Sequence, residues 1–245
     1  MSLRITARTA RRILRQLSHD RRTVAMLLVI PVLLLTLLRY LFDSQPLLFD
    51  RIGLIMLGVF PFIVMFLITS VAMLRERTSG TLERLLTTPL HKLDMLLGYG
   101  LAFALAAAVQ AVVVAGVAYW FLGLDSAGSP WLVGLIAIGN AVLGMALGLF
   151  FSAFARSEFQ AVQFMPLIVL PQALLCGLFV PRESMVGWLQ AISRAMPLTY
   201  AVQALTEVGQ HADPTNLMWR DLGIIFGLAI VALFLGAATL RRRTG

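Results

Sequence analysis

The sequence predicts an all-α integral membrane protein that crosses the bilayer six times. Of its 245 residues, 59% are hydrophobic and only 13% are charged, and the mean hydropathy is +0.87. A soluble domain of this composition would expose large apolar patches, so the composition is typical of a polytopic helical membrane protein. The single cysteine, Cys176, lies in an apolar run and indicates neither a disulfide framework nor a metal cluster.

Six apolar runs are long enough to cross the hydrocarbon core as helices. They are Val24–Leu41, Ile52–Leu74, Met95–Leu122, Trp131–Phe154, Gln160–Val180 and Leu222–Leu240. Two pairs of glycines spaced four apart, Gly144/Gly148 and Gly223/Gly227, predict close packing against neighbouring helices. We expect one membrane domain over residues 1–245, because no segment outside the spans is long enough to hold a core of its own.

A basic amphipathic helix is predicted for residues 1–23. Apolar residues such as Ile13 and Leu17 occupy one side of this helix. The arginines gather on the other side: Arg4, Arg8, Arg11, Arg12 and Arg15. Such a helix lies on a membrane surface with its arginines toward anionic lipid headgroups. A cleavable organellar presequence has a similar composition. Nucleic acid is not expected as a partner, because no aromatic stacking residues accompany the arginines.

The distribution of Lys and Arg predicts that both termini are cytoplasmic. With that orientation, the inner segments hold the following numbers of Lys and Arg residues: seven before the first span, four between spans two and three, one between spans four and five, and three after the sixth. That is fifteen of the 20 Lys and Arg residues in the chain. Cytoplasmic loops carry the excess of positive charge in membrane proteins. The polar connection between spans two and three is therefore also expected in the cytoplasm.

That connection, Arg75–Leu90, has the sequence RERTSGTLERLLTTPL and predicts a short helix. Gly80 can serve as its N-cap, and Pro89 ends it. Leucines recur on one face with helical spacing: Leu82, Leu85 and Leu86. A helix of about two turns is unstable alone in water, so its leucine face must dock on another surface. That surface is either the membrane domain of the same chain or a partner protein.

The segment between the fifth and sixth spans predicts two short helices on the outer side. Pro181–Met196 carries apolar residues on one helical face and is too short to cross, which suits a helix in the outer interface or one that dips into it. A second short helix is expected from Pro197 to about Val208. The hydrophilic piece Gly209–Asp221 follows and is too small to be a receptor domain.

These features together resemble the type-2 ABC export permeases. The resemblance rests on Glu76, on Gly80–Glu83 and on Pro89–Leu90, which are similar to the coupling segment after the second span of that family. It extends to the basic elbow helix, the six spans and the paired half-helices, and it looks closest to the daunorubicin-resistance and related drug or lipid exporters. The phrase Pro197–Tyr200 also resembles the family, although Met196 replaces the usual Asn and Thr206 stands where Arg is common.

The resemblance implies two permeases, identical or homologous, with two ATP-binding cassette subunits that drive export by alternating access. ATP and Mg²⁺ would be bound by the ATPase partner, and this chain would hold no cofactor, metal or catalytic residue. Coupling to the ATPase would involve Glu76, Gly80, Thr81, Leu82, Glu83, Leu85, Leu86 and Pro89. The expected layout is an interfacial helix (1–23), spans one and two (24–74), a coupling segment (75–94), spans three to five (95–180), outer half-helices (181–221), and the last span with a basic tail (222–245). The arginine-rich, lysine-poor composition suggests a GC-rich bacterial genome, and the expected location is the bacterial inner membrane.

The substrate is expected to be hydrophobic or amphiphilic, drug-like or lipid-like, because the spans offer an apolar, acid-free lining. Candidates for the pathway are Phe60, Phe62, Phe66, Gln163 and Phe164, although core packing explains the same aromatics as well. Polysaccharide or glycolipid export by the same architecture is the alternative substrate class.

Several chemistries are missing from the sequence. Every Asp, Glu and His falls at a span edge or in a loop, which argues against a proton relay. Neither an H-E-x-x-H motif nor a phosphate-binding G-x-x-x-x-G-K-S/T loop occurs. Energy for directional transport would therefore arrive from another polypeptide. An ATPase-independent carrier or channel, and a membrane anchor that moves nothing, are the alternatives of another class.

Overall fold

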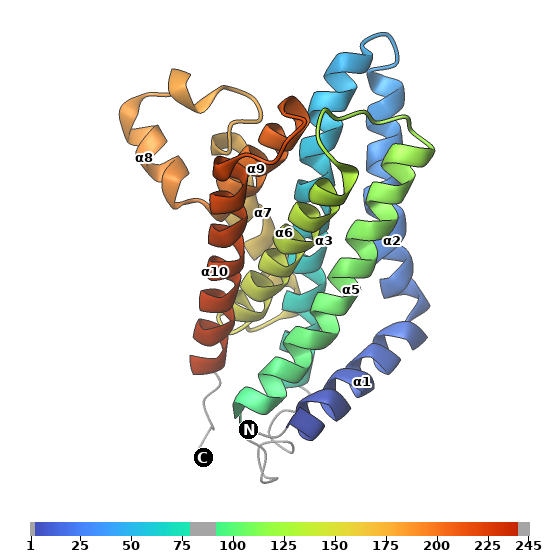
Figure 1. Ribbon diagram of the computed structural model, residues 1–245. Coiled ribbons are helices and arrows are strands. Elements are labelled where there is room, and N and C mark those ends of the chain that lie inside the picture. The colour runs from blue at the N-terminus through green and yellow to red at the C-terminus, as the bar shows by residue number, and fades with distance from the viewer. Residues whose placement is uncertain (1–2, 79–91, 240–245) are drawn as a thin grey trace.

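The computed structural model describes residues 3–78 and 92–239, and within these ranges the regular elements are all helices (Figure 1). Six of them are long and apolar enough to cross a membrane. They are α2 (Arg21–Leu41), α3 (Pro46–Thr78), α5 (Lys92–Trp120), α6 (Pro130–Phe151), α7 (Glu158–Leu175) and α10 (Asn216–Ala238). The predicted all-α membrane fold with six spans is confirmed.

The bundle has two distinct ends. Helix α1 (Leu3–His19), the end of α3, the start of α5 and the end of α10 lie together at one end, which we call the basal end (Figure 1). The opposite end, called the distal end, carries the turn between α2 and α3 and the helices between α7 and α10 (Figure 1). Both helical termini of the described chain therefore lie on the same side, as an even number of spans requires.

Local capping explains where two of the spans begin. Asp20 accepts hydrogen bonds from the Thr23 backbone N–H (3.2 Å) and hydroxyl (2.6 Å), which separates α1 from α2. Thr215 Oγ1 accepts from the Met218 N–H (3.1 Å), so α10 begins at Asn216 and not at Leu222 as the hydropathy predicted. The prediction missed this first turn because it is polar, and Arg220 and Asp221 consequently belong to the last span.

Other boundaries also differ from the prediction. Helix α3 is 33 residues long and continues through Thr78, so the charged residues after Leu74 are helical and not part of a loop. Helix α7 stops at Leu175, five residues before the predicted end. The predicted helix Pro181–Met196 is divided into a short 3₁₀ turn, η1 (Arg182–Ser184), and α8 (Gly187–Ala195).

The closest helix contact joins α3 to α6 through glycines. A Cβ atom added to Gly144 would collide with the carbonyl oxygen of Phe62, and one added to Gly148 with the Phe66 carbonyl oxygen and Thr69 Oγ1. The prediction of close packing at this pair is confirmed. For Gly223 and Gly227 it is wrong within the described part of the chain, because no described atom lies within 4 Å of a Cβ built at either position.

The larger buried core lies between α3, α6, α10 and α9 (Pro197–Gln210). Helix α9 is short but buried on one side, where Leu198, Val202 and Leu205 pack into this core. Helix α7, by contrast, has only three buried residues, Ala161, Val169 and Gln172. Helix α8 projects away from the bundle at its distal half (Figure 1). The spans are therefore buried to different extents, and α3 and α6 are central while α7 is peripheral.

Candidate functional site at the basal end

Most of the residues predicted to couple to an ATPase lie outside the described residues. These are Gly80, Thr81, Leu82, Glu83, Leu85, Leu86 and Pro89. Glu76 is described, and it lies in the last turn of α3, two residues before Thr78, the last residue of that helix. Helix α3 ends at Thr78 and α5 begins at Lys92, and both of these helix ends lie at the basal end of the bundle (Figure 1).

The last turn of α3 contacts three separate parts of the fold through three consecutive residues, Arg75, Glu76 and Arg77, which we call the basal hub. Successive side chains on a helix point about 100° apart, so three neighbours in sequence can face three neighbours in space. Arg75 reaches α7, Glu76 faces α1, and Arg77 reaches the C-cap of α10. The hub therefore connects the helix that leads into residues 79–91 with both chain-terminal helices and with α7.

Glu76 faces a polar contact between α1 and α5. Its carboxylate Oε1 lies 3.9 Å from Arg12 Nη2, and the Glu76 side chain is only 16% exposed. The same Arg12 nitrogen donates a hydrogen bond to the hydroxyl of Tyr99 on α5 (2.9 Å), and Tyr99 is buried. Arg12, Glu76 and Tyr99 thus bring together α1, α3 and α5 beside the point where the predicted coupling segment begins.

Helix α1 packs tightly on α5 at this point. A Cβ atom added to Gly98 would lie 2.7 Å from Thr9 Cβ and 3.1 Å from the Thr6 carbonyl oxygen. Ala10 and Ile13 are buried on the same side of α1. Only a glycine at position 98 permits this approach, because any larger residue would force the two helices apart.

The arginines of α1 divide into two groups. Arg8, Arg11 and Arg15 are exposed, as expected for a helix that lies on a membrane surface. Arg12 contacts Glu76 and Tyr99 while its side chain stays 36% exposed, and its assignment to the surface group remains a prediction. It differs because it lies at the edge of the apolar face, one residue before the buried Ile13. Arg4 is helical, but its side chain is outside the described part.

Arg75 makes the best-formed ion pair of the basal end. Its Nε donates to Glu158 Oε1 (2.7 Å) and its Nη2 donates to Glu158 Oε2 (2.9 Å), so the pair is bidentate. Glu158 is the first residue of α7. The sequence placed both residues at span edges without indicating that they meet. The third contact of the hub is longer, from Arg77 Nη2 to Thr239 Oγ1 (3.5 Å).

Residues 4–208 match the model of the family described as ABC-2 type transporter. The chain belongs to the ABC-2 type transporter family. The match covers α1, the first five spans and most of α9, and it confirms the resemblance that the sequence suggested.

Three curated relatives of this ABC-2 chain are bacterial permeases. The probable multidrug ABC transporter permease YbhR of Escherichia coli is 26% identical over 159 residues, which cover 64% of this chain and 42% of the relative. The inner membrane transport permease YhhJ of E. coli is 29% identical over 181 residues, 72% of this chain and 47% of the relative. The linearmycin resistance permease protein LnrN of Bacillus subtilis is 24% identical over 168 residues, 69% of this chain and 43% of the relative. The matched part of this chain corresponds to less than half of each of these relatives.

The predicted pathway residues of this ABC-2 chain do not line one surface. Phe62 and Phe66 are fully buried where α3 packs on α6, which favours the core-packing alternative for these two. Phe60 and Phe164 are half-buried, and Gln163 is exposed on α7. Two of the five share an aromatic cluster, because Phe151 lies 6.0 Å from Phe66 and 6.3 Å from Phe164 between ring centroids.

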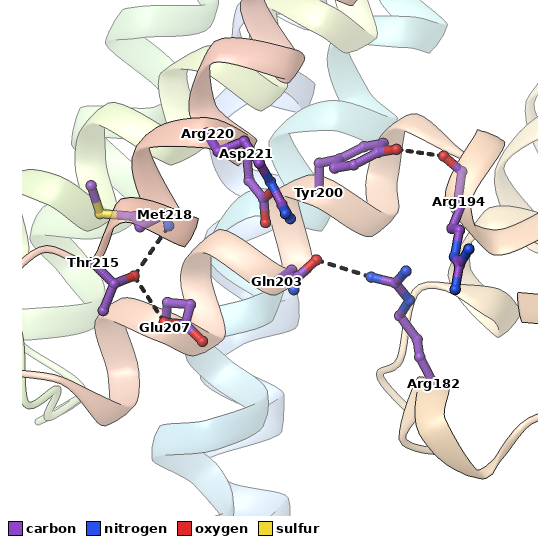
Figure 2. Close-up of polar contacts among 9 residues, drawn as sticks. All are labelled: Arg182, Arg194, Tyr200, Gln203, Glu207, Thr215, Met218, Arg220 and Asp221. Atoms are coloured by element: carbon purple, nitrogen blue, oxygen red, sulfur yellow. Dashed lines mark hydrogen bonds and ion pairs between the residues drawn. The ribbon is translucent and has the colours of Figure 1, made fainter.

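The distal end carries a polar cluster that the sequence did not indicate (Figure 2). Asp221 on α10 is fully buried, and its Oδ1 accepts from Arg220 Nε (3.0 Å) and Nη2 (2.8 Å). Arg182 of η1 donates to Gln203 Oε1 on α9 (2.9 Å). In the sequence, the only sign of this cluster was the adjacent Arg and Asp before the predicted start of the last span.

The same cluster continues along α9 and joins it to the start of α10. Thr215 Oγ1 donates to Glu207 Oε2 (2.8 Å) while it caps α10 (Figure 2). Tyr200 donates to the carbonyl oxygen of Arg194 at the end of α8. The cluster therefore ties η1, α8, α9 and α10 together at the distal end. The family match ends at residue 208, so the α10 half of the cluster lies beyond it.

Proposed function

We propose that this chain is the membrane-spanning permease subunit of an ATP-driven exporter, with its basal end in the cytoplasm and its ATPase on a separate polypeptide. The observation that carries the proposal is the basal hub. The helix turn that opens the predicted coupling segment and leads into residues 79–91 contacts α7, α1 and the end of α10. Movement of residues 79–91 would therefore reach the bundle at a turn that contacts α7, α1 and the end of α10.

The orientation follows from charge. The exposed arginines of α1 and the hub arginines lie at the basal end, and the chain places most of its Lys and Arg in segments on that side. Positive residues are retained on the cytoplasmic side during insertion. With the basal end inside, residues 79–91 are on the side where ATP is available.

The ATPase is assigned to another chain because this sequence has no G-x-x-x-x-G-K-S/T loop. Two copies of it would act on two permeases. Helices α2 and α7 have the smallest buried share among the six candidate spans, so they have large faces free for lipid or a second permease. The exposed Gln163 on α7 favours contact with protein there, because a polar side chain is poorly accommodated by lipid.

For the substrate, we propose a hydrophobic or amphiphilic molecule that leaves the cytoplasm or the inner leaflet. Support comes from the apolar membrane helices and from relatives whose names refer to multidrug transport and linearmycin resistance. Glu83 and the leucines of residues 79–91 would form the contact with the ATPase. Burying one leucine there would contribute roughly 1.5–3 kcal/mol before the entropy of association is subtracted.

The test combines partner capture with transport. The tagged permease is purified from its native membrane, and co-purifying ATPase and ATP-dependent uptake of amphiphilic dyes into inverted vesicles are measured. The double variant Leu82→Asp/Leu86→Asp should release the ATPase and abolish uptake at a normal permease level, since charges would be desolvated on docking. The control is Asp213→Ala, which lies in the distal loop outside the spans and should leave ATPase binding and uptake unchanged.

Four results would contradict the proposal. Normal ATPase binding and transport by the double variant would rule out the coupling role of these leucines. Loss of the permease itself would indicate that the leucine face packs on its own membrane domain. Wild-type protein that transports without an ATPase would be a carrier, and protein that moves no substrate would be an anchor.

A further inference from the structure

Helix α7 is attached to the rest of the chain along a narrow stripe. Its buried residues Ala161, Val169 and Gln172 recur at helical spacing on one side, and the other sides are exposed. At the basal end this stripe packs on α3, where Ala161 and Leu74 belong to a small buried cluster with Ala155. Helix α3 is thus the neighbour through which a displacement at the basal end can reach α7.

The stripe is reinforced at the basal end by the Arg75–Glu158 pair. Both nitrogen–oxygen contacts of the pair are short, at 2.7 and 2.9 Å, and their parallel arrangement fixes the orientation of one helix relative to the other. Arg75 lies three residues before Thr78, the last residue of α3. Glu158 lies in the first turn of α7, where a carboxylate is favoured by the positive end of the helix dipole.

At its distal end, α7 forms hydrogen bonds with the two half-helices, α8 and α9. Gln172 Oε1 accepts a hydrogen bond from the Leu198 N–H in the first turn of α9 (3.2 Å). The Leu175 carbonyl oxygen accepts from Ser193 Oγ on α8 (2.8 Å). A displacement of α7 would therefore be passed directly to α8 and α9, and from α9 to the distal polar cluster.

We propose that Arg75 and Glu158 form the link through which α3 displaces α7, so that movement of residues 79–91 at the basal end repositions the half-helices at the distal end. The proposal rests on the proposed function, because it assigns a transmission step to that transport cycle. Arg75 and Glu158 are positioning residues that do not contact the substrate.

Stability alone does not explain a bidentate pair at this place. The Arg75 and Glu158 side chains are 61% and 52% exposed, and ion pairs in such positions contribute little to folding. Removing the pair should consequently leave the fold in place. A large loss of transport in such a variant would then report on transmission.

The experiment uses the full permease with its ATPase in proteoliposomes and measures permease level, ATP hydrolysis without substrate, and ATP-driven transport of an amphiphilic dye. Glu158→Gln and Arg75→Gln should each lower transport by about two- to thirty-fold, the range found for residues that carry coupling. Permease level and substrate-free ATP hydrolysis should stay unchanged. The matched control is Asp43→Asn, which breaks the Arg39–Asp43 pair (3.2 Å) at the distal end of α2. The control should transport normally.

The charge-exchanged variant Arg75→Glu/Glu158→Arg provides the rescue. It should transport better than Glu158→Gln, although not fully, because Arg at the start of α7 opposes the helix dipole. A short crosslinker between cysteines introduced at positions 75 and 158 should restore transport as well. The native Cys176 is buried, and burial raises the pKa of its thiol, so it should not compete for the reagent.

Each outcome separates the two proposals. If the wild-type complex shows no ATP-driven transport, the proposed function fails. If the wild type transports and Glu158→Gln transports equally well, the link is wrong while the function stands. Loss of transport without recovery in either the charge-exchanged or the crosslinked variant would also overturn the link, because the effect would then not depend on the connection.

Discussion

Gln110 on α5 donates a hydrogen bond from Nε2 to the carbonyl oxygen of Leu27 on α2 (2.8 Å). Leu27 precedes Pro31 by four residues, and proline has no N–H to donate back to that carbonyl. The amide of one helix thus satisfies the backbone group that a proline leaves free in another. In a bilayer such a group has no water to bond with. Gln110 therefore joins α5 to α2 beside Pro31, and this contact accounts for one of the few polar residues inside the spans.

This relationship predicts coupling between Gln110 and Pro31. Gln110→Leu should destabilise the folded permease, because the Leu27 carbonyl loses its partner in an apolar setting. In a Pro31→Ala background the backbone N–H returns, and the same change should destabilise by about 1 kcal/mol less. Unfolding in mixed micelles measures the four members of the cycle. Equal effects in both backgrounds would show that the amide does not serve the proline.

The glycine contacts predict opposite results for two similar substitutions. Gly148→Ala should destabilise the permease by about 1–3 kcal/mol, because its Cβ meets the Phe66 carbonyl oxygen across the α3–α6 contact. Gly227→Ala should be tolerated, because none of the residues that the structure describes has an atom within 4 Å of the new Cβ. Expression and thermal stability in detergent give the comparison. A sensitive Gly227 together with a tolerant Gly148 would mean that α10, and not α6, makes the close contact.

Neighbouring arginines on α1 should also behave differently. Arg12→Ala removes the hydrogen bond to Tyr99 and the ion pair with Glu76, and should destabilise the permease by about 1–2 kcal/mol. Arg11→Ala removes only an exposed side chain and should have little effect on stability. Thermal unfolding of both variants and protease access to α1 test this. Equal losses would place both arginines in the same environment.

The cap between α1 and α2 predicts a pH dependence. Hydrogen bonds from Thr23 hold the pKa of Asp20 below its usual value. The cap therefore stabilises fully above the unfolded-state pKa and loses its effect as the pH falls through the lower folded-state pKa. Asp20→Asn keeps an acceptor oxygen that does not titrate. The stability advantage of wild type over this variant should shrink on acidification, measured as the difference in Tm. An advantage that grows in acid would contradict the assignment.

Much of the architecture could be predicted because the bilayer restricts what a sequence can do. A long apolar run must form a helix that satisfies its own backbone, so the six spans followed from hydropathy alone. The amphipathic nature of α1 followed from the segregation of Arg8, Arg11 and Arg15 from the apolar side. Helix ends were less predictable. The polar first turn of α10 looked like loop, because hydropathy does not register the cap at Thr215.

The contacts of the candidate site could not be predicted, because they depend on where distant helices meet. Arg75 and Glu158 are 83 residues apart, and each alone is an ordinary charged residue at a span edge. The two glycine pairs have the same spacing, yet within residues 3–78 and 92–239 only Gly144/Gly148 faces a backbone, since helix rotation decides which side of a span is inside. The sequence by itself determined that this chain is a six-span helical membrane protein with a basic surface helix. Only the tertiary structure decided which charged residues form ion pairs and which helices pack together, because both depend on packing between segments far apart in the chain.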